Sequence, residues 1–310
     1  MEHGLVAAIL FATVVAGTPL MIAALGELVA ERAGVLNLGV EGMMAVGAVA
    51  GFAAAHASGS SAAGVGAGLL AGAAMSAIFG VLALTLMANQ VASGLALSIF
   101  GVGLSAFVGK AWEAESLAAV PATPLPLLAD FPVIGHALFS HQWLVYASWG
   151  LLAAVAWFLA RSRAGLVLRA VGESPSSAHA IGQPVMRIRW LATLFGGAMA
   201  GVAGAFLSVF HTPLWAEGMV AGKGWIALAL VVFATWRPLR AALGAYLFGG
   251  VMVAQLFLQG SGLQVEVSSQ LLSALPYLAT VVVLVAISRN RQTIRLNSPV
   301  SLGQPWRADR

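Results

Sequence analysis

Long apolar runs separated by short polar loops dominate this sequence and leave it few ways to fold in water. Hydrophobic residues make up 60% of the 310 residues, and charged residues make up only 8%. A soluble domain carries roughly a quarter charged residues, because charge must coat its surface. The apolar runs therefore need a lipid bilayer as their solvent, and we expect an all-α protein that crosses it many times.

The lengths of the apolar runs predict where these crossings lie. A helix rises 1.5 Å per residue, so about 20 apolar residues cross the hydrocarbon core. The expected spans are residues 5–25, 39–56, 64–87, 91–109, 143–160, 190–210, 241–258 and 271–288. A further run, 224–235, is too short to cross alone. We therefore expect about nine transmembrane segments, within a range of roughly eight to ten, in one domain of residues 1–288. A cytoplasmic tail, 289–310, follows this domain.

The positions of the basic residues predict the orientation of the chain. If successive apolar runs cross the membrane in alternating directions, 13 of the 15 Lys and Arg residues fall on the same side. They are Arg32, Arg161, Arg163, Arg169, Arg187, Arg189, Arg237, Arg240, Arg289, Arg291, Arg295, Arg307 and Arg310. Because positively charged loops stay in the cytoplasm during insertion, we expect the loop 161–189 and the C-terminus inside and the N-terminus outside. Glu2 and His3 precede the first run instead of a basic segment, so this run is predicted to be a span and not a cleaved signal peptide.

Composition and spacing argue against several other classes of protein. Cysteine is absent, which excludes disulfides, thiolate catalysis and Cys-ligated zinc. The net charge of +4 comes from arginines between apolar runs, which is a topology signal, so no nucleic-acid partner is expected. Ser93 shares its run with no histidine, and the scattered histidines lack metal-ligand spacing. We expect no catalytic residue, no metal site and no cofactor in this chain.

Two polar segments interrupt the apolar pattern. The first break covers residues 27–41, and the second covers residues 213–224, directly before the short run 224–235. Non-helical backbone at membrane depth persists only where protein buries it or where it lines a watered cavity. Both breaks are therefore expected to border a pathway through the membrane. The residues assigned to this pathway are Asn37, Gly39, Glu41, Asn89, Gln90, Ser93, Glu217, Gly222 and Lys223.

The two breaks also resemble each other in sequence. The segment EGMMA at 41–45 aligns with EGMVA at 217–221. The charge rule places the first on the cytoplasmic side and the second on the outer side. This is the arrangement of an inverted repeat whose broken helices meet near the midplane, with chance similarity in a Gly/Ala-rich chain as the alternative.

The charged residues in the two breaks are expected to find partners nearby. A local ion-pair set at the inner boundary is predicted for Glu27, Glu31 and Arg32. An unpaired charge at the bilayer centre costs several kcal/mol. Glu217 and Lys223 are therefore expected to pair with each other or with an outer vestibule.

The loop 161–189 carries the signals of a short capped helix at 175–181. Ser174 suits an N-cap, Pro175 suits the first turn, where its missing N–H costs nothing, and Gly182 suits the left-handed position after the helix. A helix of under two turns is marginal in water, so it needs a docking surface. The loop either rests as a solvated segment on the lipid headgroups or presents this helix to a groove of a partner protein.

Three segments give the chain a family resemblance. They are ERAGVLNLGVEGMM at 31–44, LRAVGESPSSAHAIG at 168–182 and GMVAGKGWIALALVVFATWRPL at 218–239. In this order and spacing they resemble the permease subunit of bacterial ABC importers of the ribose, branched-chain amino acid and nucleoside group. The resemblance covers nearly the whole chain and is closest to the nucleoside or simple-sugar branch.

The resemblance implies an importer built from several chains in the bacterial cytoplasmic membrane. It implies two permease chains, identical or different, driven by cytoplasmic ABC ATPase subunits and supplied by an extracytoplasmic substrate-binding protein. In that family the loop matching 172–184 engages the ATPase. This assigns a coupling role to Gly172, Glu173, Ser174, Pro175, Ala178, Ala180, Ile181 and Gly182. The family often carries Asn where this chain has Ser98, which weakens the transfer of a substrate contact to that position.

ATP hydrolysis is expected on a separate chain. The pair Gly222-Lys223 lacks both the upstream glycine and the following Ser or Thr of a phosphate-binding loop, so ATP-Mg is assigned to the partner ATPase. The expected substrate is a nucleoside or a simple sugar, and a branched-chain amino acid is the alternative. An ion-coupled secondary transporter is the alternative class, since broken helices and an intramembrane acid would suit it. Such a carrier has no use for a capped cytoplasmic helix between arginines.

Overall fold

A computed structural model describes residues 2–126, 128–129, 131, 134–260, 274, 278, 285 and 297–307, and the elements assigned within them are all helical. The α-helices are α1 (Glu2–Arg32), α2 (Val40–Ser58), α3 (Ser61–Gly80), α4 (Gln90–Gly109), α5 (Ile134–Phe139), α6 (Trp143–Arg161), α7 (Arg163–Glu173), α8 (Pro175–Ala180), α9 (Val185–Ala205), α10 (Lys223–Phe233) and α11 (Pro238–Gly260). The π-helices η1 (Val81–Thr85) and η3 (Phe206–His211) continue α3 and α9, and the 3-10 helix η2 (Lys110–Trp112) continues α4.

The predicted spans are confirmed over the described residues. Seven helices there are long and apolar enough to cross a bilayer, and they correspond to the first seven predicted runs. The run 224–235 forms α10, whose 11 residues are too few to span, as predicted. The eighth predicted run, 271–288, lies outside the described residues apart from isolated positions.

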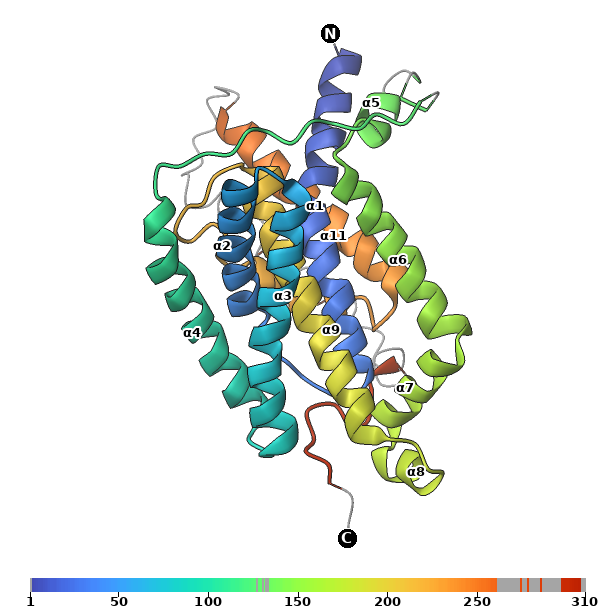
Figure 1. Ribbon diagram of the computed structural model, residues 1–310. Helices are drawn as coiled ribbons and strands as arrows, with labels where there is room; N and C mark the ends of the chain where they lie inside the picture. The colour runs from blue at the N-terminus through green and yellow to red at the C-terminus, as the bar shows by residue number, and fades with distance from the viewer. Residues whose placement is uncertain are drawn as a thin grey trace.

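The centre of the bundle is α9, which packs against α1, α2 and α3 (Figure 1). Small residues allow this approach, because lipid supplies no hydrophobic drive between helices and backbones must come close to gain contact. A side chain at Gly72 of α3 would collide with the carbonyl of Gly197 in α9. A side chain at Gly201 of α9 would likewise collide with the carbonyl of Gly68. The glycine-rich runs are therefore required at this contact.

One end of the bundle gathers α7, α8 and the C-terminal residues (Figure 1). The predicted helix at 175–181 is confirmed as α8, and its caps are those expected. The hydroxyl oxygen of Ser174 accepts from the N–H of Ser177, Pro175 opens the helix, and Gly182 has φ +81°. The loop was also considered as a solvated segment. Residues 163–173 of it form the amphipathic helix α7 instead.

The first break is shorter than predicted. The helix α1 continues through Glu27 and Glu31 to Arg32, and α2 begins at Val40, so only residues 33–39 lie outside helices. The second break is confirmed, since residues 212–222 are non-helical between η3 and α10. The break was predicted to start at residue 27 because Glu27 and Glu31 are polar. Both are buried inside the bundle, where a helix can hold carboxylates that lipid would not tolerate.

The arrangement predicts which side of the membrane reaches each loop. Cysteines introduced at Ser176 and Gln304, both exposed at the end that holds α8, should react with a membrane-impermeant thiol reagent only from the cytoplasm. Cysteines at Ala57 and Ser116, at the other end, should react only from outside. The absence of native cysteine makes the background clean. Labelling of position 116 from the cytoplasm would overturn the orientation.

Candidate functional site

The two breaks meet at the carboxylate of Glu41. Its Oε1 atom accepts from the N–H of Gly222 at 2.6 Å, and its Oε2 atom accepts from the N–H of Gly224 at 2.7 Å. These donors lie at the N-terminus of α10, which has no capping side chain of its own. A helix N-terminus carries unpaired N–H groups and a partial positive charge, both of which a carboxylate neutralises. A side chain in the first turn of α2 therefore caps a helix 181 residues away in sequence.

The local backbone explains why α10 begins at this point. Gly222 has φ +81° and Gly218 has φ +75°, a region that residues with a Cβ atom seldom adopt. The left-handed turn at Gly222 directs the following N–H groups toward Glu41. Gly224 packs directly on the backbone of Glu41, because an added Cβ atom would lie 2.5 Å from the Glu41 Cα atom. The contact between α10 and α2 thus depends on glycine at both positions.

The polar side chains of the first break satisfy its own backbone. The Oδ1 atom of Asn37 accepts from the N–H of Gly39 at 2.9 Å, and the Oε1 atom of Glu27 accepts from the N–H of Asn37 at 3.1 Å. The Oε1 atom of Gln90, at the start of α4, accepts from the N–H of Leu36 at 2.8 Å. Buried N–H groups outside helices need such acceptors, because no water reaches them.

The other end of α10 is also held by charged side chains, from α1. The indole of Trp236 donates to Oε2 of Glu31 at 2.6 Å, and the guanidinium of Arg32 donates to the carbonyl of Trp236 at 2.9 and 3.2 Å. Thr235 and Trp236 have positive φ angles, which are strained for residues other than glycine. The bonds from Glu31 and Arg32 stabilise this turn. The predicted ion-pair set of Glu27, Glu31 and Arg32 is wrong for the described residues, because these groups bond the indole and the backbone instead.

A cleft of about 390 Å³ lies beside the capped end of α10. It is bounded by α2, by α4, by the loop 215–222 and by the first turn of α10. Most of its lining is apolar, and the indole and polar side chains within it are those of Glu41, Ser98, Ser105, Trp215, Glu217 and Trp225. Such a mixture of indole faces and hydrogen-bonding groups suits a polar organic ring.

The structure brings three of the nine predicted pathway residues into this cleft, Glu41, Glu217 and Gly222. Asn37 and Gly39 lie in the first break, Gln90 of α4 accepts a bond from it, and Asn89 caps α4 by accepting from the N–H of Ala92. Ser93 is buried in α4, outside the lining of the cleft.

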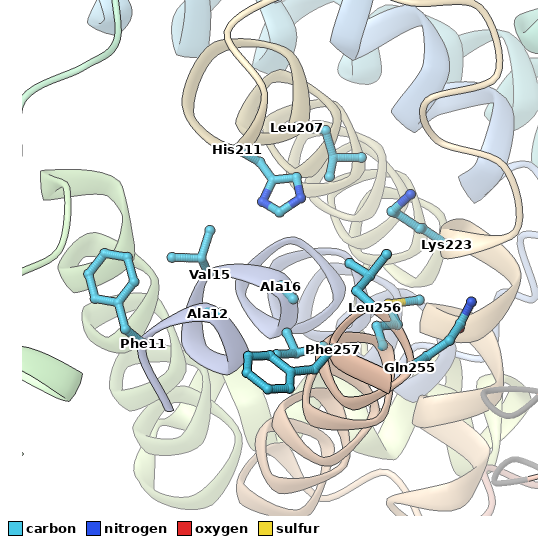
Figure 2. A pocket seen from close by; sticks show the side chains of 12 residues that line it. Phe11, Ala12, Val15, Ala16, Leu207, His211, Lys223, Gln255, Leu256 and Phe257 are labelled. Carbon is cyan, nitrogen blue, oxygen red and sulfur yellow. The ribbon is translucent and has the colours of Figure 1, made fainter. Parts of the chain in front are cut away.

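Lys223 borders a second cavity, of about 840 Å³, between η3, α1 and α11. Figure 2 shows its side chain and that of His211 on one side, with Phe11 of α1 and Phe257 of α11 on the other. The predicted pair of Glu217 and Lys223 is not formed among the described contacts, because the Lys223 ammonium donates to the carbonyl of Met219 at 2.8 Å. This volume is the space that the described residues leave between them.

Sequence reasoning missed the walls of the cleft. Ser105, Trp215 and Trp225 were not assigned to the pathway, and Ser98 was set aside. No local sequence pattern predicts the π-helix η3 and the loop after it, which together place Trp215 against α2. The helical spacing of Ser98 and Ser105, seven residues apart, does place both on one face of α4 and could have been used.

Seven of the eight predicted coupling residues divide into two groups. Gly172, Pro175 and Ala178 are buried, and Ala178 is enclosed with Val171 and Val185 in a small core under α8. Glu173, Ala180, Ile181 and Gly182 are exposed at the end of the bundle, with Ile181 73% exposed. Only the second group is available to a partner. Ser174 is occupied as the N-cap of α8.

Removing the carboxylate of Glu41 should destabilise the protein. In E41A the N–H groups of Gly222 and Gly224 lose their acceptor, and each buried unpaired group costs about 1–3 kcal/mol. E41Q keeps the side-chain volume and one carbonyl acceptor, so its thermal midpoint in detergent should lie between those of E41A and the unchanged protein. As a control, G150A adds a methyl group inside α6 where nothing lies within 4 Å, and it should not lower the midpoint. Equal midpoints for E41A and G150A would contradict the capping role.

Comparisons with known proteins identify the family. Residues 9–286 match the model of the family described as branched-chain amino acid transport system / permease component. A Haloferax volcanii protein provisionally named a glucose ABC transporter permease is 42% identical over 97% of both chains. The nucleoside ABC transporter permease NupC of Lactococcus lactis is 32% identical over 86% of this chain and 88% of that protein. The guanosine ABC transporter permease NupQ of Bacillus subtilis is 31% identical over 95% of both.

No solved structure matches the chain. The family and the seven apolar helices together establish a multi-pass protein of the cytoplasmic membrane that acts as a transport subunit and not as an enzyme. Such subunits imply an ATPase and a substrate-binding protein as partners. The chain belongs to the family of branched-chain amino acid transport system permease components, and within ABC transporters it is a permease.

Proposed function

We propose that this permease forms the membrane pathway of an ATP-driven importer for a simple sugar or a nucleoside. The observation that carries the proposal is the cleft beside the capped half-helix α10, where a carboxylate, serines and tryptophans border one space. Sugars and nucleosides share a hydroxyl-bearing ring, which hydrogen-bonding groups and indole faces can contact. The relatives named for glucose and for nucleosides support the same substrate classes.

The proposal extends to the partner chains. A second permease, identical or different, completes the pathway, and an extracytoplasmic binding protein delivers the substrate to the end that holds Ala57 and Ser116. ATP-Mg is bound and hydrolysed by the partner ATPase, which contacts the exposed face of α8 at the opposite end. The helix α8 supports this assignment because it is short and capped, and because the apolar side chain of Ile181, which follows it, is exposed.

Uptake measurements test the substrate class. Proteoliposomes that contain the permease, its ATPase and its binding protein should accumulate labelled glucose or guanosine when ATP is supplied to the ATPase side, without an ion gradient. Glucose is tested first, because the relative named for it has the highest identity of the three compared. Leucine serves as the competing substrate. Uptake of leucine alone would refute the proposal, and uptake that needs an ion gradient would refute the ATP-driven mechanism.

Filling the cleft should block transport without unfolding the protein. Ala216 is exposed in the loop that lines the cleft, so A216W places an indole there with little demand on the backbone. The rate of uptake should fall at least tenfold, which corresponds to an increase of about 1.4 kcal/mol or more in the activation free energy of transport. The yield of folded protein should be unchanged. L70W adds the same side chain on the exposed surface of α3, away from the cleft, and should transport normally. Unchanged uptake by A216W would exclude the cleft from the pathway.

The exposed face of α8 should bind the ATPase through Ile181. I181D puts a charge where an apolar contact is proposed, so it should lower copurification of the ATPase and substrate-stimulated ATP hydrolysis severalfold. I181V keeps an apolar side chain and should behave like the unchanged protein. Ala178 is unsuitable for this test because it is buried under α8. Normal hydrolysis and uptake by I181D would show that α8 does not couple the two chains.

A further inference from the structure

The C-terminal residues 297–307 return to the cytoplasmic end and bond the foot of the central helix α9. The guanidinium of Arg189, only 1% exposed, donates to the hydroxyl of Ser301 at 3.0 Å and to the carbonyl of Gln304 at 3.1 Å. Both of its terminal nitrogens are thus paired with the tail. A buried guanidinium left without acceptors is strongly unfavourable, so these bonds fix the tail in place.

The same few residues connect two segments that are far apart in sequence. Ser301 donates through its N–H and its hydroxyl to the carbonyl of Gly172, at 3.0 and 2.7 Å, where α7 ends and α8 is about to begin. Gly303 donates through its N–H to the carbonyl of Gly34, in the first break, at 3.2 Å. The tail therefore links the base of α8 to the turn that precedes α2 and Glu41.

The tail also covers α8 itself. The indole of Trp306 donates to the hydroxyl of Ser176 at 3.3 Å, and its ring lies 5.3 Å from that of His179 in an edge-to-face arrangement. Trp306 packs on the small core that contains Ala178, which is 2% exposed. A helix of six residues has little stability alone, so α8 depends on this cover to keep its position.

We propose that residues 300–307 form a coupling strap, which makes α8, the foot of α9 and the first break move as one body. A force applied to α8 then reaches the turn at Gly34 and, through α2, the carboxylate that caps α10. The strap is a second cytoplasmic element of coupling, in addition to α8. This inference rests on the proposed function in one respect, because the partner ATPase is the source of the force. The contacts of the strap do not depend on the proposed function.

Thiol accessibility tests whether the strap covers α8. The chain has no cysteine, so A178C introduces a single thiol beneath Trp306. If A178C alone is produced in normal yield, its thiol should react slowly with a reagent applied from the cytoplasmic side. W306A, or deletion of residues 300–310, should accelerate the reaction at least tenfold, whereas W306F should not. W157A removes an exposed tryptophan from α6 and serves as the matched control. Equal rates in W306A and W157A would overturn the proposal.

The ratio of substrate transported to ATP hydrolysed tests whether the strap transmits motion. In W306A, and in S301A if W306A folds poorly, transport and ATP hydrolysis are both measured per molecule of ATPase that copurifies with the permease. The transport ratio should fall fivefold or more, and W306F should restore most of it. An unchanged ratio in both variants would overturn the transmission role. If the unchanged complex moves neither sugar nor nucleoside, the proposed substrate fails, while the thiol rates still decide whether the strap exists.

Discussion

The bonds from the Glu41 carboxylate to the N-terminus of α10 are the interaction on which the rest of the structure depends. A helix of 11 residues cannot cross the bilayer, so its first N–H groups lie inside the protein, where water does not satisfy them. Glu41 supplies two acceptor atoms and a negative charge where α10 presents donors and the positive end of its dipole. The same carboxylate stands in the first turn of α2, so one side chain stabilises two helix N-termini. The bonds to both oxygens offset the cost of removing this carboxylate from water.

The opposite end of α10 depends on a second set of buried polar groups. Glu31 and Arg32 bond the indole and the carbonyl of Trp236, which holds a turn of positive φ angles between α10 and α11. The short helix α10 is thus fixed at both ends by side chains of α1 and α2, and its first turn borders the cleft that α2 and α4 also line. Because α1 ends at Arg32, where the first break begins, the bonds from Arg32 to Trp236 connect the first break to this end of α10. Any element that moves the first break acts on α10 through these bonds.

Many of the polar side chains near the breaks bond the backbone, which gives several of the predicted pathway residues a structural role. Asn37 and Gln90 were assigned to a pathway because they are polar at membrane depth, yet their oxygens accept from N–H groups of the first break. In a bilayer an unpaired N–H costs several kcal/mol, so a broken helix needs such acceptors before any polar group is free for a ligand. Sequence alone cannot distinguish these uses, because both require the same residue types near the same breaks.

The sequence by itself determined the elements that follow from local rules. Apolar run length located the spans, and the cap, proline and glycine at positions 174, 175 and 182 defined α8 to within one residue, since these signals act over a few neighbouring residues. Tertiary structure alone decided which groups meet. The pairing of Glu41 with Gly222 and Gly224, the indole walls of the cleft and the bonds from Arg189 to Ser301 join residues more than 100 positions apart. Such contacts depend on how closely the glycine-rich faces of the helices approach, which no local pattern encodes.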